Sequence, residues 1–280
     1  MAVVTVGGGT AGVRAHARLR AVPDGRGGTA LPVLAGEGPL ALRRTRDADG
    51  EARVRVVGAM SGPLGGDRFL LEADVAAGAR LRVGSAAATI ALPGQGKEPA
   101  RYETRLRVAD DAALRWEPEP LISVRGSELE VLTRVEVAEG GRLLLREEQV
   151  LGRHGEPPGD LRSRLTVRVG PDLVLDQQVT CGPGAPRGWD GPAVLGGHRA
   201  VGQVLLVDPV LGARPVTPGV FGTTASLVPL PGPAALITAV APDALRLRRL
   251  LDEALHALCA TLDRPLPPAP RTPWGAAVSV

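Results

Sequence analysis

Several acidic side chains lie where the chain can present them to a cation or to a partner. Asp67 follows two glycines, which permit positive φ angles and a close approach of the backbone. Glu117 and Glu119 alternate with prolines that hold their segment extended, so both acids face one side. Such a pair suits the passage of a cation or the tuning of one carboxylate by the other. Glu156 lies in a glycine-rich loop beside an arginine and a histidine.

Each of these acids also has a purely structural interpretation. Asp67 can close an Asx-type turn. Glu117 and Glu119 can belong to a solvated strand edge that proline and charge protect from pairing. Glu156 can form a simple salt bridge with Arg153. Residue types and spacing leave both interpretations open for all four acids.

The chain lacks the motifs of the common catalytic classes. It contains no nucleophile elbow, HExxH, CxxC or GxxxxGK[ST] motif, so hydrolase, zinc-protease, redox and nucleotide-hydrolysis functions lack their central residues. Cys181 and Cys259 show no paired spacing, which predicts neither a disulfide framework nor a zinc site and favours a reduced, cytoplasmic setting. We therefore predict a protein that is not an enzyme and holds no cofactor tightly.

Charge and hydropathy argue against nucleic acid and membranes as partners. The formal net charge is +3, and the basic residues are spread among acids. Aromatic residues make up 2% of the chain, too few for a platform that stacks single-stranded nucleic acid. No apolar run reaches the roughly 20 residues that cross a bilayer, and no signal-peptide pattern opens the chain.

The glycines Gly7, Gly9 and Gly12 match the GxGxxG pattern of dinucleotide-binding folds. The next residues contradict that interpretation, because apolar and polar side chains alternate strictly from Val13 to Ala21. A period of two indicates a half-buried strand and not the helix whose N-terminus would hold a pyrophosphate.

The same alternation continues along most of the chain, broken by small turns at a regular interval. Units of strand, turn and strand begin at Val75, Val108, Val137 and Val169, about 30 residues apart. A repeat of this length predicts β layers that each bury one face on the next. We therefore predict a mainly β fold, a single large domain of stacked antiparallel hairpins in a β-helix-like arrangement over residues 1–262.

One helix is predicted, at the end of this domain. Residues 242–262 place leucines and alanines on one face and charged side chains on the other, which is typical of an amphipathic helix. The proline-rich segment 263–280 predicts a mobile tail.

Short motifs occur in an order that resembles one known family. They are Ser61-Gly-Pro-Leu-Gly-Gly-Asp67 with the small-residue strand 85–92, then Trp116-Glu-Pro-Glu-Pro120, then Gly152-Arg153 with Gly155-Glu156, then Trp189-Asp-Gly-Pro192. This ordered set resembles the urease accessory protein D family, UreD, which is called UreH in some lineages.

The resemblance implies a non-catalytic scaffold that, with UreF and the GTPase UreG, docks on apo-urease and helps to insert nickel into its active site. Oxygen ligands that bind and release nickel readily would suit such a transfer. The resemblance therefore implies that Asp67, Glu156, Glu117 and Glu119 lie on a transient nickel path. The alternative is a stand-alone β-solenoid module that binds another protein or a carbohydrate.

Overall fold

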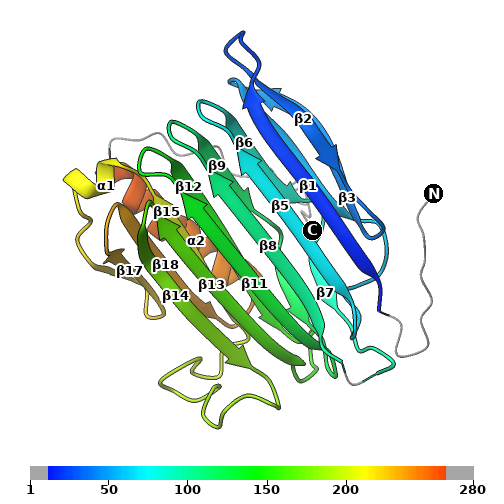
Figure 1. The fold of residues 1–280 in the computed structure, drawn as a ribbon. Coiled ribbons are helices and arrows are strands. Elements are labelled where there is room, and N and C mark those ends of the chain that lie inside the picture. The colour runs from blue at the N-terminus through cyan, green and yellow to red at the C-terminus, as the bar shows by residue number, and fades with distance from the viewer. Residues whose placement is uncertain (1–11, 97, 263–280) are drawn as a thin grey trace, which may run out of the picture.

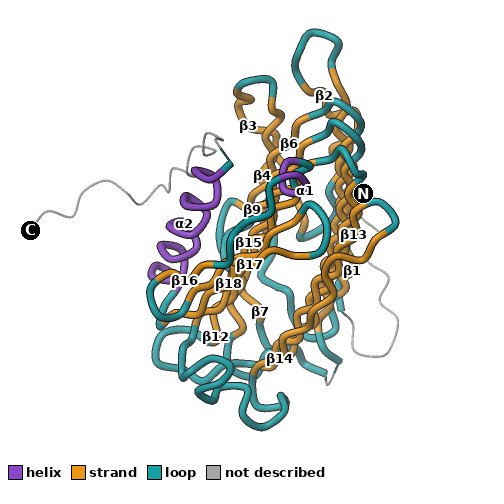
Figure 2. Tube along the Cα trace, turned by 90° about the vertical axis from the view of Figure 1, so that its left-hand side faces the viewer, coloured by secondary structure: helices purple, strands orange, loops and turns teal. Residues whose placement is uncertain are grey.

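Two β-sheets face each other, and one long helix lies against the outer face of the second sheet (Figures 1 and 2). The computed structural model describes residues 12–96 and 98–262. Apolar side chains from both sheets meet in the space between them, among them Leu71 and Leu106 from the first sheet and Leu114 and Leu145 from the second. Burial of these aliphatic side chains is the main favourable contribution to folding.

The first sheet has seven strands in the order β14-β13-β11-β8-β5-β1-β2. The five strands from β13 to β1 run parallel, and β14 and β2 pair antiparallel at the two edges. The bounds are β1 Arg14–Pro23, β2 Thr29–Ala35, β5 Arg68–Val75, β8 Ala100–Val108, β11 Glu128–Val137, β13 Asp160–Val169 and β14 Asp172–Cys181.

The second sheet has the order β16-β17-β18-β15-β12-β9-β6-β4-β3, with the short strands β10 and β7 beside the far half of β12. Strands β12, β9, β6 and β4 run parallel. The bounds are β3 Leu40–Ala48, β4 Glu51–Gly58, β6 Arg80–Ser85, β7 Thr89–Ala91, β9 Ala113–Glu117, β10 Leu121–Ser123, β12 Arg142–Leu151, β15 Ala200–Val207, β16 Gly219–Phe221, β17 Ala225–Leu230 and β18 Ala234–Ala241.

Successive repeats lie side by side in register. Val75 is opposite Val108, Val108 is opposite Val137, and Val137 is opposite Val169, all in parallel pairs. The repeat, the mainly β class and the β-helix-like stacking are therefore confirmed.

The pairing within most repeats differs from the predicted antiparallel hairpins. The turn after Val75, Val108 or Val137 carries the chain from the first sheet to the second, so the two strands of one repeat lie in opposite sheets. Each strand pairs with its equivalent in the next repeat, and only β13 with β14 forms the expected hairpin among these repeats of the described chain. Alternation specifies which face of a strand is buried and does not specify its partner, which is why the sequence did not distinguish the two arrangements.

The predicted strand after the glycine pattern is confirmed as β1, which pairs in parallel with β5. Its burial alternates along most of its length, with Ala15, Ala17 and Leu19 buried. The first two glycines of that pattern lie outside the described residues.

Helix α2, Ala244–Thr261, confirms the predicted C-terminal helix. Asp243 caps it by accepting a hydrogen bond from the backbone N–H of Arg246, which satisfies one free donor of the first turn. Leu247, Leu251 and Leu255 are buried against the outer face of the second sheet. A second, short helix, α1, Val210–Ala213, was not predicted. The predicted tail 263–280 lies outside the described residues, and no described helix is long and apolar enough to span a membrane.

Candidate functional site

Three cavities follow one another between the two sheets. The Met60 cavity, of about 290 Å³, lies beside the loop before β5 and the short strand β7. It shares Ser85 and Tyr102 with the Tyr102 cavity, of about 80 Å³. The Tyr102 cavity in turn shares Glu147 and Gln149 with the Gln177 cavity, of about 470 Å³. Because neighbouring cavities share wall residues, they form one row through the interior.

Tyr102 is part of the wall between the first two cavities, together with Val56, Ser85 and Thr89. Its ring packs edge-on against Phe69, with ring centroids 6.0 Å apart. Burial raises the pKa of the Tyr102 hydroxyl to about 12, so the phenol stays neutral at physiological pH. Tyr102 therefore contributes an uncharged side chain to the wall that these two cavities share.

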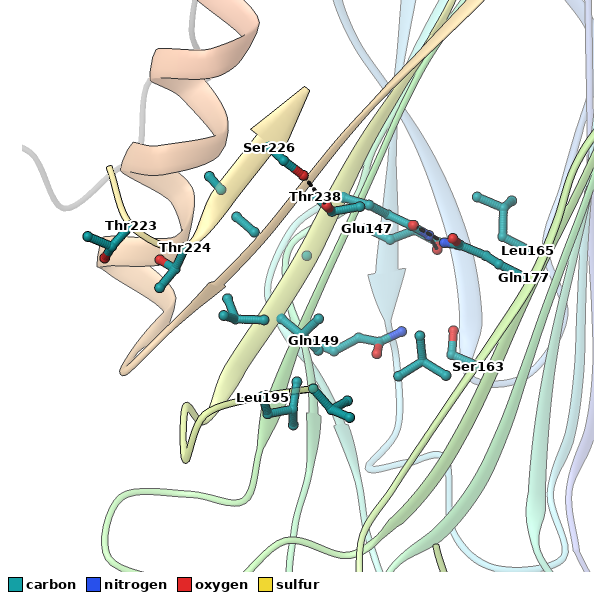
Figure 3. Close-up of a pocket in the computed structure, with 18 of the residues that line it drawn as sticks. Glu147, Gln149, Ser163, Leu165, Gln177, Leu195, Thr223, Thr224, Ser226 and Thr238 are labelled. Carbon is teal, nitrogen blue, oxygen red and sulfur yellow. Dashed lines mark hydrogen bonds between the residues drawn. The ribbon is translucent and has the colours of Figure 1, made fainter. Parts of the chain in front are cut away.

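The Gln177 cavity lies where the first sheet ends and the second continues. The first sheet stops at β14, whereas the second extends through β15, β18, β17 and β16. The residues along the cavity come mainly from β13 and β14 on one side and from β12, β15, β17 and β18 on the other (Figure 3). Val194 and Val220 line this cavity and are exposed, so it opens to solvent beside them.

Glu147 is the central charged group of the row. It lies on β12 and accepts hydrogen bonds from the Thr133 hydroxyl (2.7 Å) and from the Gln203 amide (2.8 Å). The Gln203 carbonyl accepts in turn from the Gln177 amide, so the chain of polar groups joins the two sheets (Figure 3). Protein surrounds the Glu147 carboxyl, and part of its surface stays free because it borders two cavities.

Glu147 differs from the other carboxylates that line the cavities. Glu119 and Glu148 border the Tyr102 cavity, and both are ion-paired with Arg248 of α2. Glu147 has no arginine or lysine partner among the described residues. It is therefore the one carboxylate lining these cavities, within the described chain, whose charge no cation compensates.

The pattern of residues along β12 marks Glu147 as an inward-facing acid. The alternation along β12 places Glu147 on the same face as Leu143 and Leu145, which are buried between the sheets. An acidic residue at the inward position of a strand is costly to bury without a cation, so it marks a candidate site.

Glu147 gives a testable dependence of stability on pH. Burial raises the pKa of its carboxyl above the ordinary 4.5, although the hydrogen bonds from Thr133 and Gln203 lower it in part. The folded chain thus binds this proton more tightly than the unfolded chain. The stabilisation that comes from this proton is fully present below the pKa of Glu147 in the unfolded chain. It is lost as the pH rises through the raised pKa of Glu147 in the folded chain.

We therefore expect Glu147→Gln, which cannot ionise, to gain melting temperature relative to the unchanged protein as the pH rises from acidic to mildly alkaline. Thermal unfolding of both proteins across that range measures the difference. A difference that does not change with pH would show that Glu147 titrates as an ordinary exposed acid.

Asp67 is buried in its turn, with 3% of its surface exposed. One carboxylate oxygen accepts from the backbone N–H of Val13 (2.8 Å), and the other accepts from that of Leu64 (2.8 Å). The preceding Gly66 has φ +92°, as the two glycines suggested, and an added Cβ at Gly12 would lie 1.9 Å from the Gly66 carbonyl oxygen. One Asp67 oxygen therefore holds the start of β5 against the start of β1, and the other closes the turn before β5.

Glu117 and Glu119 each contact arginines. Glu117 lies between Arg82 (3.0 Å) and Arg115 (2.9 Å), and Glu119 bonds to Arg248 (3.1 Å). Of the two, Glu119 also lines a cavity.

Glu156 forms a two-pronged ion pair with Arg153 in an exposed loop. The Arg153 guanidinium and backbone N–H donate to its carboxylate at 2.9 to 3.1 Å. These hydrogen bonds lower the pKa of Glu156 to about 2. The structure does not gather the four predicted acids, and the described residues contain no group of three or more His, Cys, Asp or Glu that could hold a metal ion.

Together, the stacked parallel strands and the row of cavities define a class of β-solenoid-like protein with three adjoining cavities in its interior. The chain matches the family described as UreD urease accessory protein over residues 13–274. The urease accessory protein UreD of Streptomyces avermitilis is 66% identical over 248 residues, covering 89% of this chain and 98% of its own length. That of Streptomyces coelicolor is 65% identical over 256 residues, covering 91% and 100%.

A more distant relative, urease accessory protein UreD 2 of Saccharopolyspora erythraea, is 49% identical over 250 residues and covers 88% of each chain. This chain therefore belongs to the UreD urease accessory protein family, whose name assigns it a role in urease maturation. Its relatives are named as accessory proteins and not as enzymes.

Proposed function

We propose that this chain is a non-catalytic cytoplasmic scaffold that, with UreF and UreG, docks on apo-urease and passes nickel to it through the row of three cavities. Nickel is the cargo in this proposal and not a resident cofactor. The supporting observation is Glu147, an uncompensated carboxylate at the point where the Tyr102 and Gln177 cavities share a wall.

The side chains around Glu147 have the chemistry of a transfer site. Carboxylate, amide and hydroxyl oxygens come from Glu147, Gln149, Gln203 and Ser163, all of which line the Gln177 cavity. No cysteine or histidine is among the described residues that line the three cavities. Oxygen ligands alone hold nickel less tightly than thiolate or imidazole ligands would, which favours release.

The four acids named from the sequence are less suited to this role, with Glu119 the partial exception. Both carboxylate oxygens of Asp67 and of Glu156 already accept hydrogen bonds, and Glu117 lies between two arginines. Glu119 lines the Tyr102 cavity but shares Arg248 with Glu148. We therefore place Glu147 first on the path and keep Glu119 as the next candidate.

Glu147→Gln tests this function, because it keeps the size of the side chain and removes its charge. With urease, UreF and UreG expressed together with the variant at limiting nickel, we expect the nickel content of purified urease to fall about tenfold or more, as loss of a metal-site group does. Elemental analysis of the urease measures the result, alongside urease activity.

The matched control is Glu136→Gln, which removes an exposed acid from the outer face of the first sheet, where it pairs with Arg107. This variant should load urease normally. If Glu147→Gln also loads urease normally while remaining folded, nickel does not pass by Glu147.

A further inference from the structure

Half of the outer face of the second sheet carries a group of arginines. Helix α2 packs on β12, β15, β17 and β18, and leaves the outer face of β3, β4, β6 and β9 uncovered by any described helix (Figure 2). We name the arginines on this half the outer arginine patch, which consists of Arg43, Arg53, Arg55, Arg80, Arg82 and Arg115.

Strand register places like charges directly opposite each other in this patch. Arg115 is opposite Arg82, and Arg82 is opposite Arg53, so three arginines occupy one row across three strands. Arg55 is opposite Arg43 in the next row. Like charges at directly opposed positions of a sheet repel each other, so these rows need compensation from acidic groups.

The acids within the patch compensate only part of its charge. Glu117 bridges Arg82 and Arg115, and Glu51 lies 3.4 Å from Arg53. Burial lowers the pKa of the Arg115 guanidinium and Arg82 adds to that, against the opposing effect of Glu117. Arg43, Arg55 and Arg80 form no ion pair with another described residue.

The outer face of the first sheet shows the contrast. There, Arg105 lies between Glu72 and Glu103, and Arg164 pairs with Asp176. That face also places arginines directly opposite each other, with Arg14, Arg68 and Arg101 in one row, but most of its arginines contact an acid, as expected for a solvated surface. The outer arginine patch differs because three of its six arginines, Arg43, Arg55 and Arg80, form no ion pair with another described residue.

An apolar hollow adjoins the patch. It has a volume of about 220 Å³ and lies between the C-terminal turn of α2 and strands β9 and β12, lined by Leu144, Leu206 and Leu262. Arg115, Arg142 and Asp208 are the charged residues that line it. A ligand that fits both features carries acidic groups beside an apolar side chain.

We propose that the outer arginine patch and the adjoining hollow bind an acidic segment of a partner protein, with an apolar side chain of that segment seated in the hollow. Residues 263–280 of the chain do not have the composition of such a segment, because Asp263 is their one acidic side chain and Arg264 and Arg271 are basic. Glu51 and Glu117 interrupt the positive charge of the patch, so a partner must place its acidic groups at separate positions, which spaced side chains of a protein do more readily than a continuous phosphate backbone. This surface is on the outside of the second sheet, away from Glu147, and the proposal does not depend on the nickel path.

The test variant is the triple charge reversal of Arg43, Arg55 and Arg80 to Glu, since none of these three holds an ion pair that the fold needs. The matched control reverses Arg14, Arg18 and Arg187, which are exposed elsewhere and give the same change in net charge. A second variant replaces Arg43, Arg55 and Arg80 by Gln, which removes the positive charges without introducing negative ones. Circular dichroism and melting temperature establish that each protein is folded.

Two labelled probes measure binding to each protein by fluorescence anisotropy, one a synthetic peptide of Glu and Leu and the other a single-stranded oligonucleotide. We expect the patch variants to raise the Kd for the peptide about tenfold or more, to a greater extent at low salt, and the control to leave it unchanged. The patch variants should also lose a urease-maturation partner in co-purification that the control retains. Equal peptide binding by patch and control variants, or tighter patch-dependent binding of the oligonucleotide than of the peptide, would overturn the proposal.

Discussion

Replacing Arg248 by Ala is expected to lower the free energy of unfolding by about 3 kcal/mol, because it leaves buried negative charge without its partner. Arg248 reaches from α2 to Glu148, whose side chain is 0% exposed, and to Glu119. Burial alone would lower the pKa of Arg248, yet the hydrogen bonds and charges of Glu148 and Glu119 raise it overall. In the variant, the negative charge of Glu148 would still be paired with Arg146.

Thermal unfolding measures this effect as a fall in melting temperature of roughly 6 to 12 °C for a domain of this size. Arg249→Ala is the control on the same helix, since Arg249 is exposed and forms no ion pair with another described residue. We expect that control to change the melting temperature by little. An Arg248→Ala protein as stable as the control would mean that the buried pair contributes nothing net to the fold.

Asp67→Asn is expected to destabilise the protein by about 2 kcal/mol, although Asn is the closest substitute in shape. Both carboxylate oxygens accept hydrogen bonds from backbone N–H groups, of Val13 and of Leu64. An amide has one acceptor oxygen, so its NH₂ group would face a second donor in a buried site. Asp67→Ala should cost more, about 3 kcal/mol, because it leaves both donors without a partner.

Urea unfolding of the two variants, with Asp74→Asn as an exposed control, distinguishes this structural role from the ligand role. If Asp67→Asn unfolds at the same urea concentration as the unchanged protein but lowers the nickel content of urease, Asp67 acts as a metal ligand. The expected order, Ala below Asn below the unchanged protein, identifies it as the residue that closes the turn.

The alternation of apolar and polar residues predicted most of the strands, because a period of two identifies a strand and its buried face wherever one face meets a core. The repeat at Val75, Val108 and Val137 gave the stacking, since equivalent residues of a coil must lie side by side. The pairing of the strands could not be predicted from the sequence. The short turn from Val75 to Arg80 could lead the chain back into the same sheet or across to the other sheet with the same residues.

The candidate site was predicted less well than the fold. The four acids chosen were conspicuous because of glycines and prolines beside them, and such neighbours specify backbone shape more than chemistry. The structural alternatives that remained open for Asp67 and Glu156, a closed turn and a salt bridge with Arg153, agree with their contacts. The pairing of Arg248 with Glu148 joins residues 100 positions apart, which no local pattern indicates.

The in-register stacking of coils has a consequence for how chain length can change in this family. Adding or removing a complete coil would conserve the inward and outward positions of every neighbouring strand and would move only the end of the sheets. A single inserted residue within a strand such as β11 would turn its buried valines toward solvent over the remaining length. Divergence in length should therefore be confined to the loops between sheets or come in units of a whole coil.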